Sequence, residues 1–166
     1  MKKTSIIITL ICCFAIQVDL FAQLKISSSS FINKNIAAVS ISEAGMDFQE
    51  EIVFSQDEIM MSIKIFPQNL DNVVYNSWQI HVSKNDIDWN NDLELYIRRT
   101  GDGKNDYNKK PQNGEYFQKI ETNSSLFFVG QGWINLIPIQ VKLTGFSVTL
   151  PAKSYSTEII FTLIDN

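Results

Sequence analysis

Apolar and polar side chains alternate over long stretches in the C-terminal part of the chain. Residues 137–143 place isoleucine, valine or leucine at every second position, which is the pattern of a strand with one buried face. Residues 146–150 continue the alternation until Pro151, which cannot donate to a ladder in the middle of a sheet. Residues 155–163 alternate again, so we expect the chain to close its sheet with this last strand.

Shorter segments with the same alternation precede this region. We expect strands at 36–42, 48–54, 58–66, 73–82, 93–97, 116–120 and 126–129. Trp78, Ile80 and Val82 share one face of the range 73–82, which predicts a central strand with Trp78 as its largest core residue. Residues 84–92 are interpreted as a polar connection. Residues 101–115 are interpreted as a surface loop that folding does not need.

These elements predict an all-β fold. About eight to ten strands, spaced by roughly 8 to 12 residues, are typical of an antiparallel β-sandwich of the immunoglobulin-like or pilin-like kind. An eight-stranded barrel is the alternative. No helical periodicity follows the first 22 residues, so no connection can hold the crossover helix that parallel strands need.

The first 22 residues have the composition of a secretory signal peptide. Lys2 and Lys3 precede an apolar run at 6–16 that is well short of the roughly 20 residues needed to span a bilayer. We predict a signal-peptide helix cleaved after Ala22, followed by a single domain at 23–166. The mature chain would then be exported to the periplasm, the outer surface or the medium, without membrane insertion. Both cysteines lie within the signal, so no disulfide is expected.

Composition argues against several classes of function. The chain has a formal net charge of −4 and no block of basic residues, which argues against nucleic acid as a partner. His81 is its single histidine. One histidine without a nearby cysteine fits neither a closed zinc site nor a typical nucleophilic triad. We therefore predict a protein that is not an enzyme and needs no cofactor.

Calcium is the one metal that the sequence leaves open. Asp88, Asn90 and Asp92 place oxygen side chains at alternate positions, as the first half of an EF-type loop does. Leu93 stands where that loop needs glycine, and no glutamate follows at the twelfth position. The alternative is a solvated turn built from ordinary turn-forming residues.

Three aromatic residues next to loops are candidate ligand-binding residues: Trp89, Tyr107 and Trp133. An exposed aromatic ring can stack on a sugar or anchor a partner protein. Burial in the core is the alternative for both tryptophans. Together with the loop acids, these residues favour a carbohydrate-binding module as the second functional hypothesis, with calcium as a helper.

The last forty residues resemble the pilin-like domains of the spore coat protein U family. The resemblance lies in the Pro151-Ala152-Lys153 turn, the tyrosine at 155 and the alternating threonine and aliphatic residues up to Leu163. It implies a secreted, non-enzymatic β-sandwich that acts in surface assembly or adhesion, with surface proteins or polysaccharide as partners. Pilins of this kind assemble by strand exchange. Residues 23–30 offer only Leu24 and Ile26 as apolar anchors, so we expect this segment to cap its own domain and leave a monomer.

Overall fold

The computed structural model describes residues 23–29, 51–66, 77–105, 108–147, 150–151 and 153–165. The statements below refer to these residues. The predicted signal peptide, the predicted strand at 36–42, the start of the range 48–54 and Tyr107 lie outside them.

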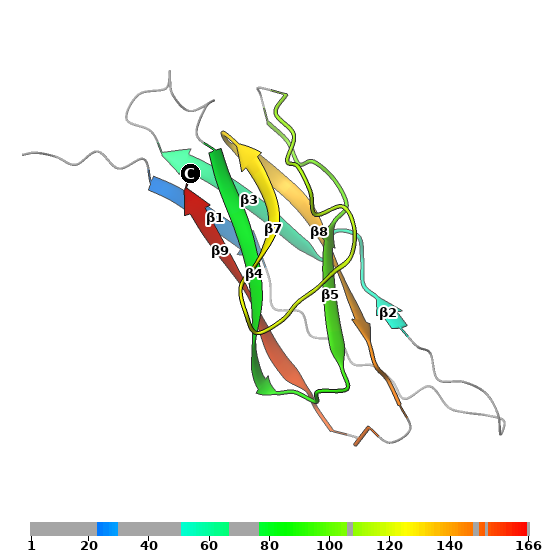
Figure 1. Ribbon diagram of the computed structural model, residues 1–166. Coiled ribbons are helices and arrows are strands. Elements are labelled where there is room, and N and C mark those ends of the chain that lie inside the picture. The colour runs from blue at the N-terminus through cyan, green and yellow to red at the C-terminus, as the bar shows by residue number, and fades with distance from the viewer. Residues whose placement is uncertain are drawn as a thin grey trace, which may run out of the picture.

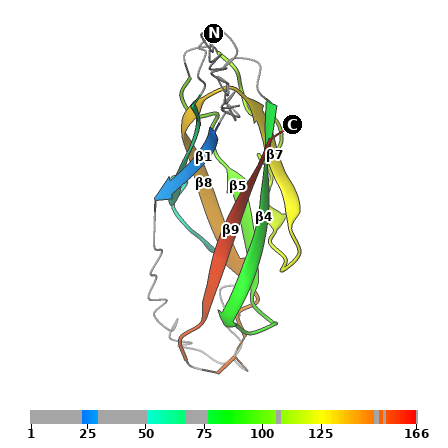
Figure 2. The same ribbon diagram turned by 90° about the vertical axis from the view of Figure 1, so that its left-hand side faces the viewer.

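The described chain forms two antiparallel sheets that face each other (Figures 1 and 2). The larger sheet has the order β1 (Gln23–Ser29), β3 (Ile59–Phe66), β8 (Ile134–Thr144), β5 (Glu94–Arg99) and β6 (Gln118–Lys119), and β2 (Glu51–Val53) also pairs with β8. The smaller sheet has the order β7 (Ser125–Gln131), β4 (Ser77–Asp88) and β9 (Ser156–Asp165). The all-β prediction is confirmed. The described strands form two separate sheets, which favours the sandwich over one closed barrel.

Strand β8 is the centre of the larger sheet. It pairs with β2 and β3 along one edge and with β5 along the other. Its residues Ile137, Ile139, Val141 and Leu143 are buried, as their alternation predicts. The register with β3 shifts next to Leu136, which has a positive φ of 53°. This irregularity lets Ile134 and Ile137, three residues apart, both reach the core.

Trp78 is fully buried in the smaller sheet, as the sequence predicts. Its indole N–H donates to the carbonyl of Gly132 at 2.7 Å, and its ring meets Phe128 edge to face at 6.0 Å between centroids. Gly130 is the partner of Trp78 on β7. A Cβ at Gly130 would lie 2.3 Å from the indole ring, so the ring occupies the space that only glycine leaves free.

Two sequence predictions about strand limits are wrong. Residues 84–88 were expected in a polar connection, but they belong to β4, because residues 156–159 of β9 pair with them. Residues 146–150 were expected to continue the strand, but the described residues among them, 146, 147 and 150, lie in the connection from β8 to β9. Gly145 begins this connection with a φ of +89°, and Phe146 and Leu150 pack against the core from it. The alternating apolar residues of this segment therefore reflect contact with the core and not pairing with a neighbouring strand.

The segment Gln23–Ser29 forms the edge strand β1 and pairs with β3 throughout its length. Pairing with β3 of its own chain agrees with the predicted capping role of this segment. No helix among the described residues is long and apolar enough to cross a membrane.

We predict that Trp78→Ala lowers the free energy of unfolding by about 3 to 5 kcal/mol, because it empties the largest side chain from the core. Chemical denaturation of the mature protein measures the loss. Trp133→Ala is the matched control, since the Trp133 side chain is 42% exposed and its removal should cost far less. A Trp78→Ala protein as stable as the parent would contradict this account of the core.

The contact between Trp78 and Gly130 gives a second prediction. Gly130→Ala should destabilise the parent by about 2 kcal/mol, because the added methyl group overlaps the indole ring. The same substitution should cost little in a Trp78→Ala background, where the ring is absent. Denaturation of the two single variants and the double variant measures this coupling. Equal costs in both backgrounds would show that the ring is not the obstacle.

Candidate functional site

Trp89 is half-buried against the core. Trp89 directly follows β4, and its ring packs against the core. Its indole N–H donates to the carbonyl of Leu93 at 2.9 Å. The Lys84 ammonium group lies 5.4 Å from the ring centroid. Trp89 therefore fits the alternative of a half-buried structural residue.

Trp133 is more accessible, with 42% of its surface exposed and its indole N–H bonded to the side-chain oxygen of Asn135 at 2.8 Å. It lies between β7 and β8, whereas Trp89 directly follows β4. The ends of β4 and β7 lie at opposite ends of the sandwich (Figure 1). The two tryptophans therefore do not form one binding surface, and Tyr107 lies outside the described residues.

Two of the three oxygen-bearing side chains proposed for calcium, those of Asp88 and Asn90, have other partners in the structure. Asp88 forms an ion pair with Lys153 at 2.5 Å, and the Asn90 side chain accepts the backbone N–H of Asp92 at 2.8 Å. The backbone N–H of Leu93 closes the turn on the carbonyl of Asn90 at 3.0 Å. This is the geometry of a solvated turn. No group of three or more His, Cys, Asp or Glu residues that could hold a metal occurs in the described part of the chain.

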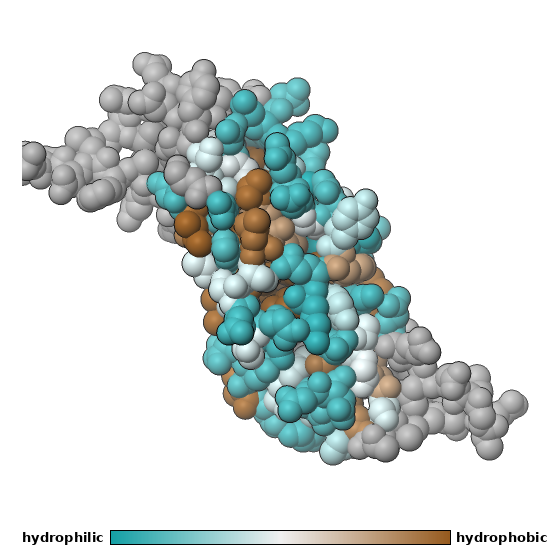
Figure 3. Space-filling view, in the orientation of Figure 1, coloured by the Kyte–Doolittle hydropathy of each residue, from teal (hydrophilic) through white to brown (hydrophobic). Residues whose placement is uncertain are grey.

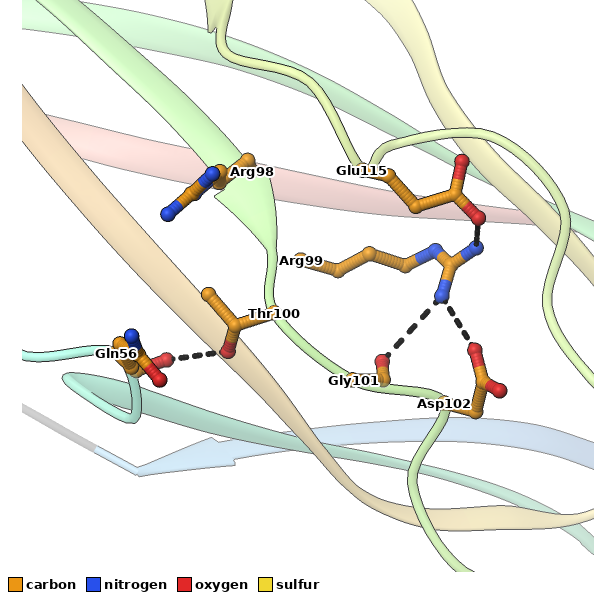
Figure 4. A pocket seen from close by; sticks show the side chains of 7 residues that line it. All are labelled: Gln56, Arg98, Arg99, Thr100, Gly101, Asp102 and Glu115. Atoms are coloured by element: carbon orange, nitrogen blue, oxygen red, sulfur yellow. Dashed lines mark hydrogen bonds and ion pairs between the residues drawn. The ribbon is translucent and has the colours of Figure 1, made fainter.

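Sequence patterns did not reveal the role of Arg99, which is the most elaborate polar site in the described structure. Its side chain is only 2% exposed at the end of β5. The guanidinium group donates to the side chains of Asp102 and Glu115 and to three backbone carbonyls, those of Gly101, Pro111 and Asn113. The bond to Asp102 is 2.7 Å long. Figure 4 shows Arg99 pointing toward both acids, away from Arg98.

Arg99 ties the connection 101–115 to the sandwich. Backbone bonds add to this attachment between Lys104 and Asn135 and between Gln112 and Val129. The sequence-based expectation that folding does not need this loop conflicts with the structure, because deleting the loop would leave a buried guanidinium group without acceptors. A buried arginine is hard to recognise from sequence, since Arg98 and Arg99 form an ordinary basic pair there.

The hollow beside Arg99 is not a promising ligand site. It has a volume of about 400 Å³ and is lined by Gln56, Arg98, Arg99, Thr100, Gly101, Asp102 and Glu115. The donors of Arg99 are taken by the loop, and Thr100 donates its hydroxyl to the Gln56 carbonyl at 2.6 Å. Arg98 is held by Gln140 and lies over the ring of Phe117. The main polar groups that line the hollow are therefore already bonded to other groups of the protein.

Burial opposes ionisation of Asp102, but hydrogen bonds from Arg99 and Lys110 outweigh it and lower the pKa of this carboxyl group. The stability that comes from a lowered carboxyl pKa is present above the unfolded-state pKa and is lost as the pH falls through the folded-state pKa. Attachment of the loop should therefore weaken only in acid.

The most open feature of the fold is the outer edge of β9. The strand is ten residues long and pairs with β4 on one side. β1 pairs with β3, and it lies close to β9 without pairing with it. Along its other side β9 has no strand partner within the described ranges. Figure 2 shows β9 at the margin of its layer. The backbone groups on this side, which have no strand partner among the described residues, form a template for another strand.

The other sheet edges are shorter or better protected. β6 is only two residues long. The edge of β7 exchanges two backbone hydrogen bonds with Gln112, which lies in the loop that Arg99 holds. β1 has seven residues and carries Lys25 and three serines in its sequence. By contrast β9 has no lysine or proline, and Glu158 is its only charged residue before the terminal Asp165.

Apolar side chains accompany the free edge on both faces of β9. Ile159, Phe161 and Leu163 pack against the core from the inner face but remain only half-buried. On the outer face Ile160 and Ile164 are 43% and 40% exposed. Figure 3 shows hydrophobic surface interrupting the hydrophilic surface on this side of the molecule. The edge thus combines free backbone groups with incompletely covered apolar side chains.

We predict that Arg99→Met lowers the free energy of unfolding by about 3 kcal/mol, because three backbone carbonyls and the Glu115 carboxylate lose their guanidinium donor and Asp102 loses one of its two cationic partners. Denaturant unfolding at neutral pH measures the loss. Hydrogen exchange should also show faster exchange at the amides of Lys104 and Gln112, whose bonds hold the loop.

Arg98→Met is the matched control for this prediction. Arg98 is half-buried on the opposite face, with one described hydrogen bond, to Gln140, so the loss should be about 1 kcal/mol. Equal losses for the two variants would mean that Arg99 has no special role in holding the loop.

Comparison of this chain with protein families, curated proteins and solved structures found no match. Its function is therefore inferred from its own residues and geometry.

Proposed function

We propose that this protein is an exported, non-enzymatic β-sandwich that works in surface assembly or adhesion, and that it binds partners by adding a strand to the free edge of β9. The observation that carries this proposal is the ten-residue edge itself, which has no strand partner in the described part of the chain. Strand addition uses backbone hydrogen bonds for affinity and alternate side chains for specificity. β9 offers both.

Three further features support a binding role at a surface. The N-terminal sequence has the pattern of a cleaved export signal. The predicted mature chain has no cysteine, so no disulfide would tie β9 to another strand. The pilin-like resemblance of residues 151–163 covers β9, the same strand that the structure leaves at an edge. Within this proposal the sandwich is of the pilin-like kind, and its partners are surface proteins.

A carbohydrate-binding module is the second hypothesis, and the geometry supports it less. Its two tryptophans lie at opposite ends of the sandwich, and its calcium residues form a turn closed by their own contacts. Of the two candidates that the structure describes, the partly exposed Trp133 is the better placed for stacking.

The proposal predicts that the mature protein binds extended peptides at β9. A panel of fluorescent ten-residue peptides with alternating apolar and polar residues, including the sequence of Ser156–Asp165, should contain binders detected by polarisation. Binding should slow hydrogen exchange at the β9 amides whose N–H groups point away from β4, because those groups gain acceptors.

Peptides of identical sequence with N-methyl groups on alternate residues are the matched controls. Methylation on the edge-facing side removes the donors while keeping every side chain, so it should abolish binding. Equal binding of methylated and unmethylated peptides would contradict strand addition at this edge. So would the absence of binding by every peptide in the panel at protein concentrations where the chain sediments as a monomer.

A further inference from the structure

We infer that the strand added to β9 is the β9 of a second copy, so that the protein forms a two-fold symmetric dimer with one continuous sheet containing three strands from each copy. This inference rests on the proposed function and names its partner. It replaces the sequence-based expectation of a monomer. It differs from strand exchange, because each N-terminal segment stays paired with its own β3.

The symmetry restricts how two β9 strands can meet. A two-fold axis perpendicular to a sheet pairs strands antiparallel and keeps outer-face residues opposite outer-face residues. Nearly full overlap of the ten residues requires an axis at Ile160 or at Phe161. The choice between these two registers depends on which side chains become neighbours.

The register centred on Ile160 gives the better neighbours on the outer face. Ile160 then lies opposite Ile160 of the second copy, so the most exposed aliphatic side chain of β9 gains an apolar partner. Glu158 lies opposite the Thr162 hydroxyl group. The register centred on Phe161 would instead place the Glu158 carboxylate opposite the aliphatic side chain of Ile164.

The inner face also agrees with the register centred on Ile160. Ile159 lies opposite Phe161 of the second copy, and Thr157 lies opposite Leu163. Ile159, Phe161 and Leu163 are the half-buried side chains that pack against the core from β9. Each copy would therefore extend the other's core at the place where its cover is incomplete.

Charge further favours antiparallel over parallel pairing of the two copies. In a parallel, in-register pair Glu158 would lie next to Glu158 and Asp165 next to Asp165, and like charges side by side destabilise a sheet. The antiparallel register separates all four carboxylates. Because the contact is two-fold symmetric, it closes at the dimer and leaves no β9 edge for further growth.

The cysteine-free mature chain allows a direct test by site-specific cross-linking. Ile160→Cys should give a covalent dimer with the shortest bifunctional thiol reagents, because opposite Cβ atoms in a ladder are about 5 Å apart. Ile164→Cys is the matched control with similar exposure. Its two cysteines would be offset by eight residues along the strands, about 27 Å at 3.4 Å per residue. This variant should therefore run as a monomer on a denaturing gel.

Sedimentation of a charge-variant pair tests the register without cysteine chemistry. In Thr162→Glu, the new glutamate of each copy lies opposite Glu158 of the other copy. These two like-charge pairs should weaken the dimer about tenfold. Thr162→Lys places opposite charges at the same positions and should leave the dimer as strong or stronger. Thermal unfolding checks that both variants keep the fold of the parent.

Three results would overturn the inference: equal cross-linking of the two cysteine variants, equal effects of Thr162→Glu and Thr162→Lys, or a sedimentation coefficient of a monomer throughout a concentration series. A monomer that still binds extended peptides in the polarisation assay would overturn the dimer and leave the proposed function standing. A protein that binds no extended peptide and does not dimerise would overturn both.

Discussion

Two sheets of unequal width enclose one core, and the other features of the structure depend on this mismatch. In the part of the chain that the structure describes, the larger sheet has six strands and the smaller sheet three. Both contribute side chains to a single apolar cluster that includes Trp78 and the inward residues of β8. The narrower sheet leaves its two edge strands, β7 and β9, as the places where the core must be closed by something other than a paired strand.

The β7 side is closed from within the chain. Arg99 holds the connection 101–115 with five acceptors, and Gln112 of this connection bonds to the edge of β7. A buried arginine is costly to desolvate, but its acceptors are all supplied by one segment that it thereby fixes in place. The loop thus gains order from a polar interaction and protects a sheet edge.

The β9 side has no equivalent cover in the described structure. Its inner side chains are half-buried, and its outer isoleucines are accessible. A sheet edge with these properties is prone to pair with another chain, and proteins that do not use such an edge usually protect it with lysine, proline or a bulge. This contrast between two edges of one sheet is the reason to place function at β9 and not at the polar hollow beside Arg99.

The sequence by itself determined the strand composition of this protein and the side chains of its core. Alternation identified β3, β8 and β9 and the buried face of Trp78, because a period of two records directly which side chains face the core. It also identified Asp88, Asn90 and Asp92 as either metal ligands or turn residues, but it could not decide between these roles, which depend on Lys153 from a distant segment.

Only the tertiary structure decided which strands are neighbours and which edges remain free. Residues 84–88 became a strand because β9 pairs with them. Residues 146, 147 and 150, which belong to an alternating segment, lie instead in a connection. Arg99 became buried because acceptors from five later residues converge on it. Pairing partners and converging acceptors are separated by tens of residues along the chain, so local periodicity carries no information about them.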